Sequence, residues 1–248
     1  SLIISQSQES FKKEIASVTT MFNSRIDGMM ISLAYDTKDT DHFEDLLRKQ
    51  IPLIFFDRVI EHPSCTSIVI DNKRAGYEAT MHLIEQGCKR IVHVDGNVNR
   101  NVYADRLDGY KQALHDSGIG FDPTLVIDNK LTDLTSSEAA QVILNMKKLP
   151  DGIFTANDTS AVACIRELKA AGLKVPEDIA VVGFNNDPIS KVIEPNLTTI
   201  DYPGQEMGEI AATTLINKLK KQPTGNLNTI VLRHKLIVRE SSLRNGKI

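Results

Sequence analysis

Polar pairs of residues follow three apolar runs of this sequence, at the positions where strands of a sheet would end. The pairs are Asp57-Arg58, Asn157-Asp158 and Asn185-Asn186. Because open α/β sheets bind ligands at the carboxyl ends of their strands, we expect these side chains to line one crevice. Carboxylate, guanidinium and amide groups there can orient a polyhydroxyl or otherwise polar ligand.

Two further arginines, Arg100 and Arg106, lie around the start of the helix expected after the apolar run Arg90–Asp95. A guanidinium adds planar, bidentate recognition of carboxylates, phosphates or vicinal acceptors. Arg106 could instead pair with Asp105 or Asp108, but residues one or two apart on a helix do not face each other. A role toward the ligand is therefore favoured for Arg106.

Some of these residues also have purely structural interpretations. Asp158 is more readily explained as a helix N-cap than as a ligand contact. For Asp57, a solvated acid at a strand end and a ligand contact are equally open. Tyr110 and Ala113, at helical spacing from Arg106, indicate packing.

No combination of residues predicts catalysis. The chain lacks a G-x-S-x-G nucleophile elbow, a G-x-G-x-x-G loop after a strand and a G-x-x-x-x-G-K-[ST] loop. Its six histidines show no metal-binding spacing. We therefore predict a binding protein rather than an enzyme, with no cofactor and no metal site.

The composition is that of an ordinary globular chain. Its 248 residues are 41% apolar with a net charge of −3, and no apolar run approaches the length of a membrane span. Basic clusters fit helix ends, so tight DNA binding by this chain alone is not expected. Three cysteines without ligand spacing and the absence of a visible secretory signal favour a reducing, cytoplasmic location.

Short apolar runs alternate with amphipathic segments, which predicts βαβ units and parallel sheets. The expected strands are Leu2–Ser5, Gly28–Leu33, Leu53–Asp57, Ser67–Ile70, Arg90–Asp95, Thr124–Ile127, Gly152–Thr155, Ile179–Phe184, Thr198–Asp201 and Thr229–Val238. The expected helices are Glu9–Asn23, Thr40–Lys49, Asn72–Gln86, Tyr103–Ser117, Ser136–Lys147, Asp158–Ala171 and Gly204–Lys221. These strands are more than one open sheet usually contains. We therefore predict an α/β fold of two Rossmann-like lobes.

A series of short motifs runs in order along almost the whole chain. They are Arg25–Met30, Pro52–Arg58, Ile70–Asn72, Gly87–Ile91, Arg106–Tyr110, Asn157-Asp158, Gly172–Asp178, Leu197–Ile200 and Leu236–Ser241. Together they resemble the effector-binding domain of the LacI/GalR family of bacterial transcriptional regulators.

The resemblance implies a periplasmic-binding-protein type I clamshell whose two lobes are joined by a three-crossing hinge, with the effector between the lobes. The implied N-terminal lobe comprises residues 1–69 and 204–231, and the C-terminal lobe residues 70–203 and 232–248. The first strand and helix of the N-terminal lobe are then absent from this sequence.

The resemblance also implies roles for individual residues. Asp57, Arg106 and Asn157 match effector-binding positions, and Arg100 matches a second arginine of purine-type members. Asn185 and Asn186 fall where sugar-type members commonly carry acids, which favours a less basic or anionic effector. Leu131 occupies an aromatic stacking position, for which Tyr202 could compensate. The predicted effector-binding residues are thus Asp57, Arg58, Arg100, Arg106, Leu131, Asn157, Asn185, Asn186 and Tyr202.

The predicted function is ligand sensing and dimerisation in a LacI-type regulator. A small polar effector, such as a sugar or sugar phosphate, would control operator binding by a helix-turn-helix head that is not in this sequence. The expected partners are the effector, operator DNA through that head and a second copy of the chain, with no membrane. The alternatives are a periplasmic sugar-binding protein for a transporter or receptor and, less favoured, an enzyme on a doubly wound scaffold.

Overall fold

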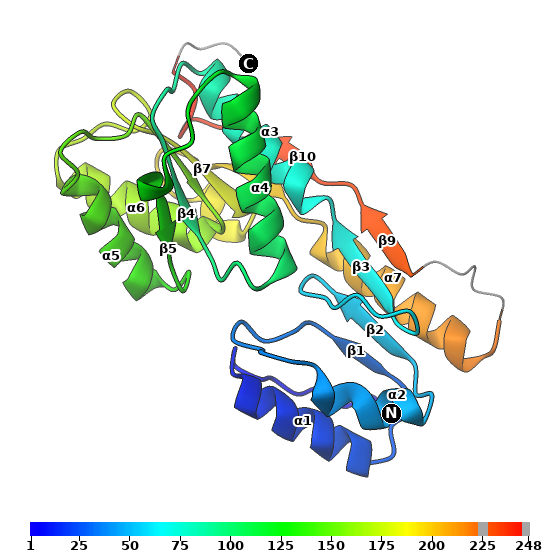
Figure 1. Ribbon diagram of the computed structural model, residues 1–248. Helices are drawn as coiled ribbons and strands as arrows, with labels where there is room; N and C mark the ends of the chain where they lie inside the picture. The colour runs from blue at the N-terminus through cyan, green and yellow to red at the C-terminus, as the bar shows by residue number, and fades with distance from the viewer. Residues whose placement is uncertain (223–227, 245–248) are drawn as a thin grey trace. The chain divides into compact units, whose positions relative to one another are not determined.

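The computed structural model describes residues 1–222 and 228–244, which fold as two compact units (Figure 1). Unit 1 comprises Ser1–Ile70 and Pro203–Arg233, and unit 2 comprises Asp71–Tyr202 and His234–Ile248. The chain therefore passes between the units three times. Parts of the predicted lobe segments 204–231 and 232–248, namely residues 223–227 and 245–248, lie outside the described residues.

The sheet of unit 1 has parallel strands in the order β1-β2-β3-β9. These strands are β1 (Met29–Ile31), β2 (Leu53–Phe56), β3 (Thr66–Ile70) and β9 (Thr229–Leu232). The apolar runs of β2 and β3 are mostly buried and match the composition of buried parallel strands. β9 pairs with β3 although most of unit 2 lies between them in the sequence.

Three helices cover the sheet of unit 1: α1 (Phe11–Asn23), the short α2 (Glu44–Arg48) and α7 (Gly204–Leu219). Val18 of α1 and Leu46 of α2 pack with Phe55 of β2 in one apolar core. α7 contacts β1, β2 and β3 and buries Met207 and Ala211. A pocket of about 420 Å³ lies beside β1 and is lined by residues of α1, β1 and the N-terminal segment.

The sheet of unit 2 has the strand order β10-β8-β7-β6-β4-β5, and all strands are parallel except β10, which runs antiparallel to β8. Its strands are β4 (Ile91–Asp95), β5 (Val126–Asp128), β6 (Gly152–Thr155), β7 (Ala180–Asn185), β8 (Thr198–Asp201) and β10 (Lys235–Ile237). The parallel sheets of the two units confirm the predicted α/β class.

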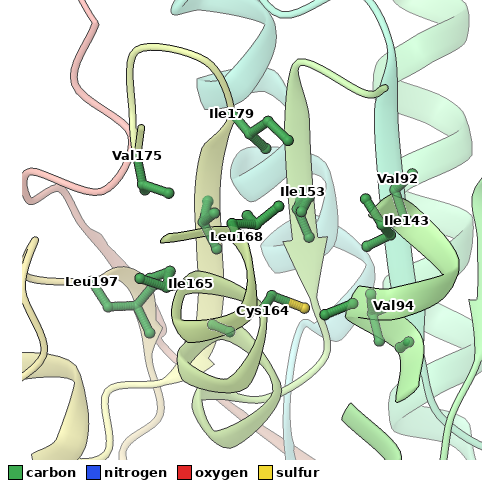
Figure 2. Close-up of a cluster of buried hydrophobic side chains, with 14 of the residues drawn as sticks. Val92, Val94, Ile143, Ile153, Cys164, Ile165, Leu168, Val175, Ile179 and Leu197 are labelled. Carbon is green, nitrogen blue, oxygen red and sulfur yellow. The ribbon is translucent and has the colours of Figure 1, made fainter. Parts of the chain in front are cut away.

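Helices α5 (Asp133–Leu144) and α6 (Asp158–Ala170) cover one face of this sheet. Figure 2 shows the core beneath them, in which strand residues such as Val92, Val94 and Ile153 meet Ile143, Cys164 and Leu168 of the helices. Neighbouring strand residues point to opposite faces. Accordingly His93, between Val92 and Val94, stacks against Tyr110 on the other face.

That other face carries α3 (Asn72–Glu85) and α4 (Asn101–Asp116), which pack closely against each other. Glycines allow the close approach: a Cβ at Gly76 would lie 2.4 Å from the carbonyl oxygen of Arg106, and one at Gly109 would lie 2.1 Å from that of Lys73. α4 is further tied to the sheet by the Tyr110 hydroxyl, which donates to the carbonyl of Ile91 at 2.8 Å. Tyr110 is thus a packing residue, as predicted.

The predicted helix ends are largely confirmed. The Asp71 side chain accepts a hydrogen bond from the Arg74 N–H at 2.8 Å and caps α3. Gly87, Gly118 and Gly172 follow three helices and have positive φ angles of 92°, 70° and 83°, the conformation in which glycine ends a helix without strain.

Three predicted elements are wrong. Leu2–Ser5 forms no strand, because no strand lies beside it to pair with its backbone within the described residues, and Leu2 is 84% exposed. The segment Thr229–Val238 is not one strand but two, because Arg233 and His234 belong to different units. The predicted helix Thr40–Lys49 is a 3₁₀ turn, Asp41–Phe43, followed by the short α2.

Candidate functional site

Four of the predicted binding residues have a positive φ angle, which residues other than glycine rarely adopt. They are Asp57 (59°) after β2, Leu131 (58°) after β5, and Asn185 (109°) and Asn186 (56°) at the end of β7. Sparsely populated backbone conformations of this kind cost about 1–3 kcal/mol each and cluster at functional sites. The carboxyl ends of strands in each unit therefore carry backbone strain at positions that the sequence singles out.

Arg106 is buried in unit 2, with 3% of its surface exposed, and its guanidinium is held in one orientation. Its Nε donates to Asn72 Oδ1 at 3.0 Å, and its Nη1 donates to the Ala156 carbonyl at 2.8 Å. Its guanidinium carbon also lies 3.5 Å from the centroid of the Phe184 ring, a close cation–π contact. Because Ala156 follows β6 and Phe184 lies in β7, α4 places a buried cation at the carboxyl ends of these strands.

Asn157 lies two residues beyond the end of β6, and its side chain makes two hydrogen bonds. Its Oδ1 accepts from the Ser160 N–H at 2.8 Å, which caps α6, and its Nδ2 donates to the Leu131 carbonyl at 3.0 Å. Leu131 is held from the other side by Asn129, whose Oδ1 accepts from the Leu131 N–H at 2.6 Å. Asn157 and Leu131, two predicted site residues, are therefore in direct contact.

The two asparagines at the end of β7 have different surroundings. Asn186 turns its amide into unit 2, where Oδ1 accepts from Arg239 Nη2 and Nδ2 donates to Asp201 Oδ1, both at 2.7 Å. Asn185 Nδ2 lies 3.4 Å from Asp187 Oδ2, and no donor of the described residues reaches the Asn185 amide oxygen. Of the two, Asn185 is the one with an acceptor left for a ligand.

Asp158 does not cap α6, so the favoured N-cap interpretation is wrong: the cap is Asn157, one residue earlier. Asp158 is instead fully buried at the start of the helix. Its carboxylate accepts from the Thr199 hydroxyl at 2.6 Å and from the Asp187 N–H at 2.7 Å. Burial raises the pKa of the Asp158 carboxyl to about 7, although these hydrogen bonds act to lower it.

Tyr202 and Arg100 lie next to these groups along the chain. Tyr202 directly follows β8, and its backbone N–H lies 3.4 Å from the Asn185 carbonyl oxygen. Arg100 precedes α4, where its backbone N–H donates to the Asn97 carbonyl at 2.8 Å. The structure thus joins the Tyr202 backbone to the Asn185 turn, and places Arg100 at the N-terminal end of the helix that carries Arg106.

In unit 1, Asp57 and Arg58 lie at the carboxyl end of β2. Arg58 forms a bidentate ion pair with Glu9, with Nη1–Oε2 and Nη2–Oε1 distances of 2.8 and 3.0 Å. The Arg58 Nε also lies 3.9 Å from Asp57 Oδ2. The Asp57 N–H donates to the Ile68 carbonyl of β3 at 3.0 Å, which fixes its left-handed backbone. The edge of this sheet therefore presents an arginine between two carboxylates.

A buried histidine–aspartate pair at the end of β4 is not predicted by the sequence patterns. His93 Nδ1 lies 3.1 Å from the Phe154 carbonyl oxygen, and His93 Nε2 lies 3.4 Å from Asp95 Oδ1. Since a carbonyl only accepts, Nδ1 carries a proton. Asp95 Oδ2 has no hydrogen-bond partner among the described residues. The signal that could reveal the pair is the presence of His93 and Asp95 in an otherwise apolar strand.

Sequence reasoning also misses Asn72, Asn129 and Arg239, which hold Arg106, Leu131 and Asn186 in place. Asn72 lies in the motif Ile70–Asn72 and Arg239 in the motif Leu236–Ser241, but neither position indicates its partner.

Within residues 1–222 and 228–244, no group of three or more His, Cys, Asp or Glu side chains is placed to hold a metal ion. No helix in the same ranges combines the length and apolar character that a membrane span needs. The three cysteines, Cys65, Cys88 and Cys164, are buried and unpaired.

Residues 80–242 match the periplasmic binding protein-like domain family. Catabolite control protein A of Priestia megaterium is 27% identical over 97% of this chain and 72% of its own length. The ribose operon repressor of Haemophilus influenzae is 28% identical over 97% of this chain and 71% of its own. The HTH-type transcriptional repressor PurR of Vibrio atlanticus is 28% identical over 88% and 65%. The chain thus spans between 65% and 72% of the length of these relatives.

Solved structures of transcriptional regulators have the same fold. The regulator CcpA of Lactococcus lactis superposes with a TM-score of 0.87 at 26% identity, over 97% of this chain and 87% of that one. A CelR–cellobiose complex gives 0.83 at 29% identity, over 92% and 70%. A LacI family regulator of Enterococcus faecium with bound ribose gives 0.82 at 26% identity, over 92% and 84%.

These likenesses confirm the two-lobe periplasmic-binding-protein type I fold, and the named relatives are regulators rather than enzymes. The chain belongs to the periplasmic binding protein-like domain family and is the effector-binding domain of a LacI-type transcriptional regulator.

Proposed function

We propose that this domain binds a sugar or sugar phosphate at the carboxyl edge of the unit 2 sheet. The observation that carries the proposal is the buried guanidinium of Arg106, fixed by Asn72, Ala156 and Phe184. A cation whose plane is fixed before binding loses little freedom when it engages a phosphate or vicinal hydroxyl groups. Asn185, at the end of β7, supplies an amide acceptor for a ligand hydroxyl at the same edge.

Two relatives support a sugar-like ligand, because their structures hold cellobiose and ribose. The charges in unit 2 favour an anionic sugar derivative over a neutral one. Asn185 and Asn186 are amides where sugar-type members commonly carry acids, and Arg100 and Arg106 add positive charge on α4 and directly before it. A phosphate would complement these arginines, whereas a cationic ligand would be repelled.

Unit 1 supplies further candidate contacts. We assign Asp57 to the ligand as an acceptor of hydroxyl hydrogen bonds, with Arg58 as the group that orients it. This assignment is supported by the left-handed backbone of Asp57 at the end of β2 and by the Arg58–Glu9 ion pair beside it. Leu131 and Tyr202 are assigned as apolar and aromatic contacts for the body of the ligand.

Isothermal titration calorimetry with four probes tests the proposal: ribose, cellobiose, ribose 5-phosphate and glucose 6-phosphate. We expect a sugar phosphate to bind more tightly than the neutral sugars. Arg106→Ala should weaken that binding about 10- to 100-fold, the range expected for a hydrogen bond to a charged group. Arg166→Ala, at an exposed arginine on α6, is the matched control and should leave affinity unchanged.

The same titration distinguishes contacts in each unit. Asn157→Ala and Asp57→Ala should each weaken binding of the sugar phosphate, which tests the two assigned residues separately. Tight binding of neutral sugars alone would contradict the anionic preference. Unchanged affinity in Arg106→Ala would overturn the site assignment itself.

We further propose that the domain acts within a longer cytoplasmic regulator that dimerises and reads operator DNA through a helix-turn-helix head. The names of the relatives, an operon repressor and an HTH-type repressor among them, support this proposal. In such a regulator the effector shifts the equilibrium between a DNA-binding and a non-binding state. The shift equals the difference in effector affinity between the two states, typically 1–3 kcal/mol. Peptide mapping of the native protein by mass spectrometry tests it. A basic helix-turn-helix segment is expected, and a cleaved secretory signal would indicate a periplasmic receptor instead.

A further inference from the structure

The turn that ends β7 contains two consecutive residues with positive φ angles, Asn185 at 109° and Asn186 at 56°. The second value is a left-handed conformation that asparagine tolerates. The first lies outside that minimum, in a region that favours glycine. Since such a conformation is strained, it persists only where surrounding contacts hold it.

The buried carboxylate of Asp158 and the hydroxyl of Thr199 accept hydrogen bonds from the backbone of this turn. The Asp187 N–H donates to Asp158 Oδ2 at 2.7 Å, and the Asn186 N–H donates to Thr199 Oγ1 at 3.2 Å. The Thr199 hydroxyl in turn donates to Asp158 Oδ1 at 2.6 Å. Asp158 and Thr199 thus satisfy two successive backbone N–H groups of the turn, although they come from α6 and β8.

The space for the Asp158 carboxylate is an independent feature of the fold. A Cβ at Gly183 would lie 2.3 Å from Asp158 Oδ1, so β7 carries no side chain at the one place where the carboxylate passes. Both Asp158 and Thr199 are fully buried and belong to unit 2. Neither of them can reach a ligand itself without a rearrangement, because their surfaces are covered.

What the pair holds in place is the amide of Asn185. The Asn186 side chain is engaged by Arg239 and Asp201, so it anchors the second residue of the turn. Asn185 is half-buried, and its amide oxygen accepts no hydrogen bond within the described residues. The place from which the Asn185 side chain extends depends on the backbone angles of Asn185, and the anchored N–H groups of Asn186 and Asp187 restrain those angles.

We propose that Asp158 and Thr199 are positioning residues that set effector affinity by holding Asn185 in its strained backbone conformation. The proposal rests on the proposed function, in which Asn185 contacts the effector. It assigns a role to two buried residues that themselves touch no ligand.

A matched pair of variants tests the role of Thr199. Thr199→Val removes the hydroxyl at nearly constant volume, whereas Thr199→Ser retains it. With ribose 5-phosphate as the probe in calorimetry, we expect Thr199→Val to weaken binding about tenfold, as for the loss of one hydrogen bond of about 1.4 kcal/mol. Thr199→Ser should bind within about twofold of the unaltered protein. Equal affinities of the two variants would overturn the proposal.

A double-mutant cycle of Thr199→Val with Asn185→Ala separates a positioning role of Thr199 from general destabilisation of the protein. If Thr199 acts through Asn185, Thr199→Val should no longer change affinity once the Asn185 amide is absent. The same tenfold loss in the Asn185→Ala background would contradict the proposal. Should Thr199→Val fail to fold, Asp158→Asn is measured in the same two backgrounds, because it replaces one of the two acceptors by a donor.

Hydrogen exchange gives a readout that needs no ligand. In Thr199→Val, the amides of Asn186 and Asp187 should exchange about tenfold faster than in Thr199→Ser, with little change in the β4 amides. If the unaltered protein binds neither ribose 5-phosphate nor the other sugars, the proposed function fails, and with it the effect on affinity. The exchange rates then still decide whether the pair holds the turn. If ribose 5-phosphate binds and Asn185→Ala leaves its affinity unchanged, the positioning proposal fails while the proposed function stands.

Discussion

The guanidinium carbon of Arg106 lies 3.5 Å from the centroid of the Phe184 ring, with both groups buried in unit 2. A cation this close to an aromatic face, away from water, gains about 0.5–2 kcal/mol. The ring therefore supports the guanidinium from one side, while Asn72 and Ala156 fix its plane through hydrogen bonds.

Replacing Phe184 by leucine should weaken binding of ribose 5-phosphate about 3- to 10-fold, because Arg106 loses its aromatic support but keeps its hydrogen bonds. Calorimetry measures the change. Phe154→Leu is the matched control, since Phe154 is equally buried on β6 but stacks on His93 rather than on Arg106. An equal loss of affinity in both variants would show that the effect is not specific to the cation–π contact.

The stability of the protein should depend on pH through Asp158. Burial raises the pKa of this carboxyl from 3.8 to about 7, so the folded chain holds a proton that the unfolded chain releases. The stabilising effect of that proton is complete below about pH 4 and is lost as the pH rises through 7, by at most on the order of 4 kcal/mol. Urea unfolding between pH 5 and pH 8 should therefore show a decline in the free energy of unfolding that is much smaller in Asp158→Asn. Parallel pH profiles of the two proteins would contradict this origin.

Glu14 should contribute the opposite pH dependence in unit 1. Its burial acts to raise the pKa, but hydrogen bonds from His42, the Ala34 N–H and the Thr37 hydroxyl outweigh that effect, so the pKa lies below its ordinary value. The stabilising contribution is then present above the unfolded pKa and lost as the pH falls. Glu14→Gln should lower the free energy of unfolding by about 1–3 kcal/mol at pH 7 and by less near pH 3. Glu44→Gln, at an exposed position of α2, is the control and should change it little.

The His93–Asp95 pair should show strong coupling. With Nδ1–H directed at the Phe154 carbonyl, His93 Nε2 faces Asp95 Oδ1 at 3.4 Å in the buried core of unit 2. His93→Phe keeps the ring stack but leaves the Asp95 carboxylate buried without that partner, which should cost about 3–5 kcal/mol. The double variant His93→Phe with Asp95→Ala should be more stable than His93→Phe alone. Urea denaturation checks this, and simple addition of the two single effects would rule the coupling out.

The parallel sheets could be predicted because their signal is local: each apolar run carries its own strand preference between turn residues. Leu2–Ser5 has the same signal and forms no strand, since a strand also needs a hydrogen-bonding neighbour. The break at Arg233 and His234 could not be predicted either, because it depends on which unit each half of Thr229–Val238 joins.

The same distinction holds for the candidate site. The strand-end rule locates Asn157 and Asn185 correctly at the edge of the sheet, because it depends only on where the apolar runs stop. That Asn186 turns inward depends on Arg239, far along the chain, and no spacing rule indicates such a partner. The burial of Asp158 likewise depends on Thr199 and on the missing side chain of Gly183.

The three passages between units have a consequence for synthesis on the ribosome. Unit 1 receives α7 and β9 only after Tyr202 has emerged, and unit 2 receives β10 and Arg239 later still. Unit 1 therefore cannot finish folding before unit 2 is synthesised, unlike an N-terminal domain whose residues are all contiguous. Unit 1 must wait, with the β3 edge that β9 covers still unpaired, until Leu232 at the end of β9 has been translated.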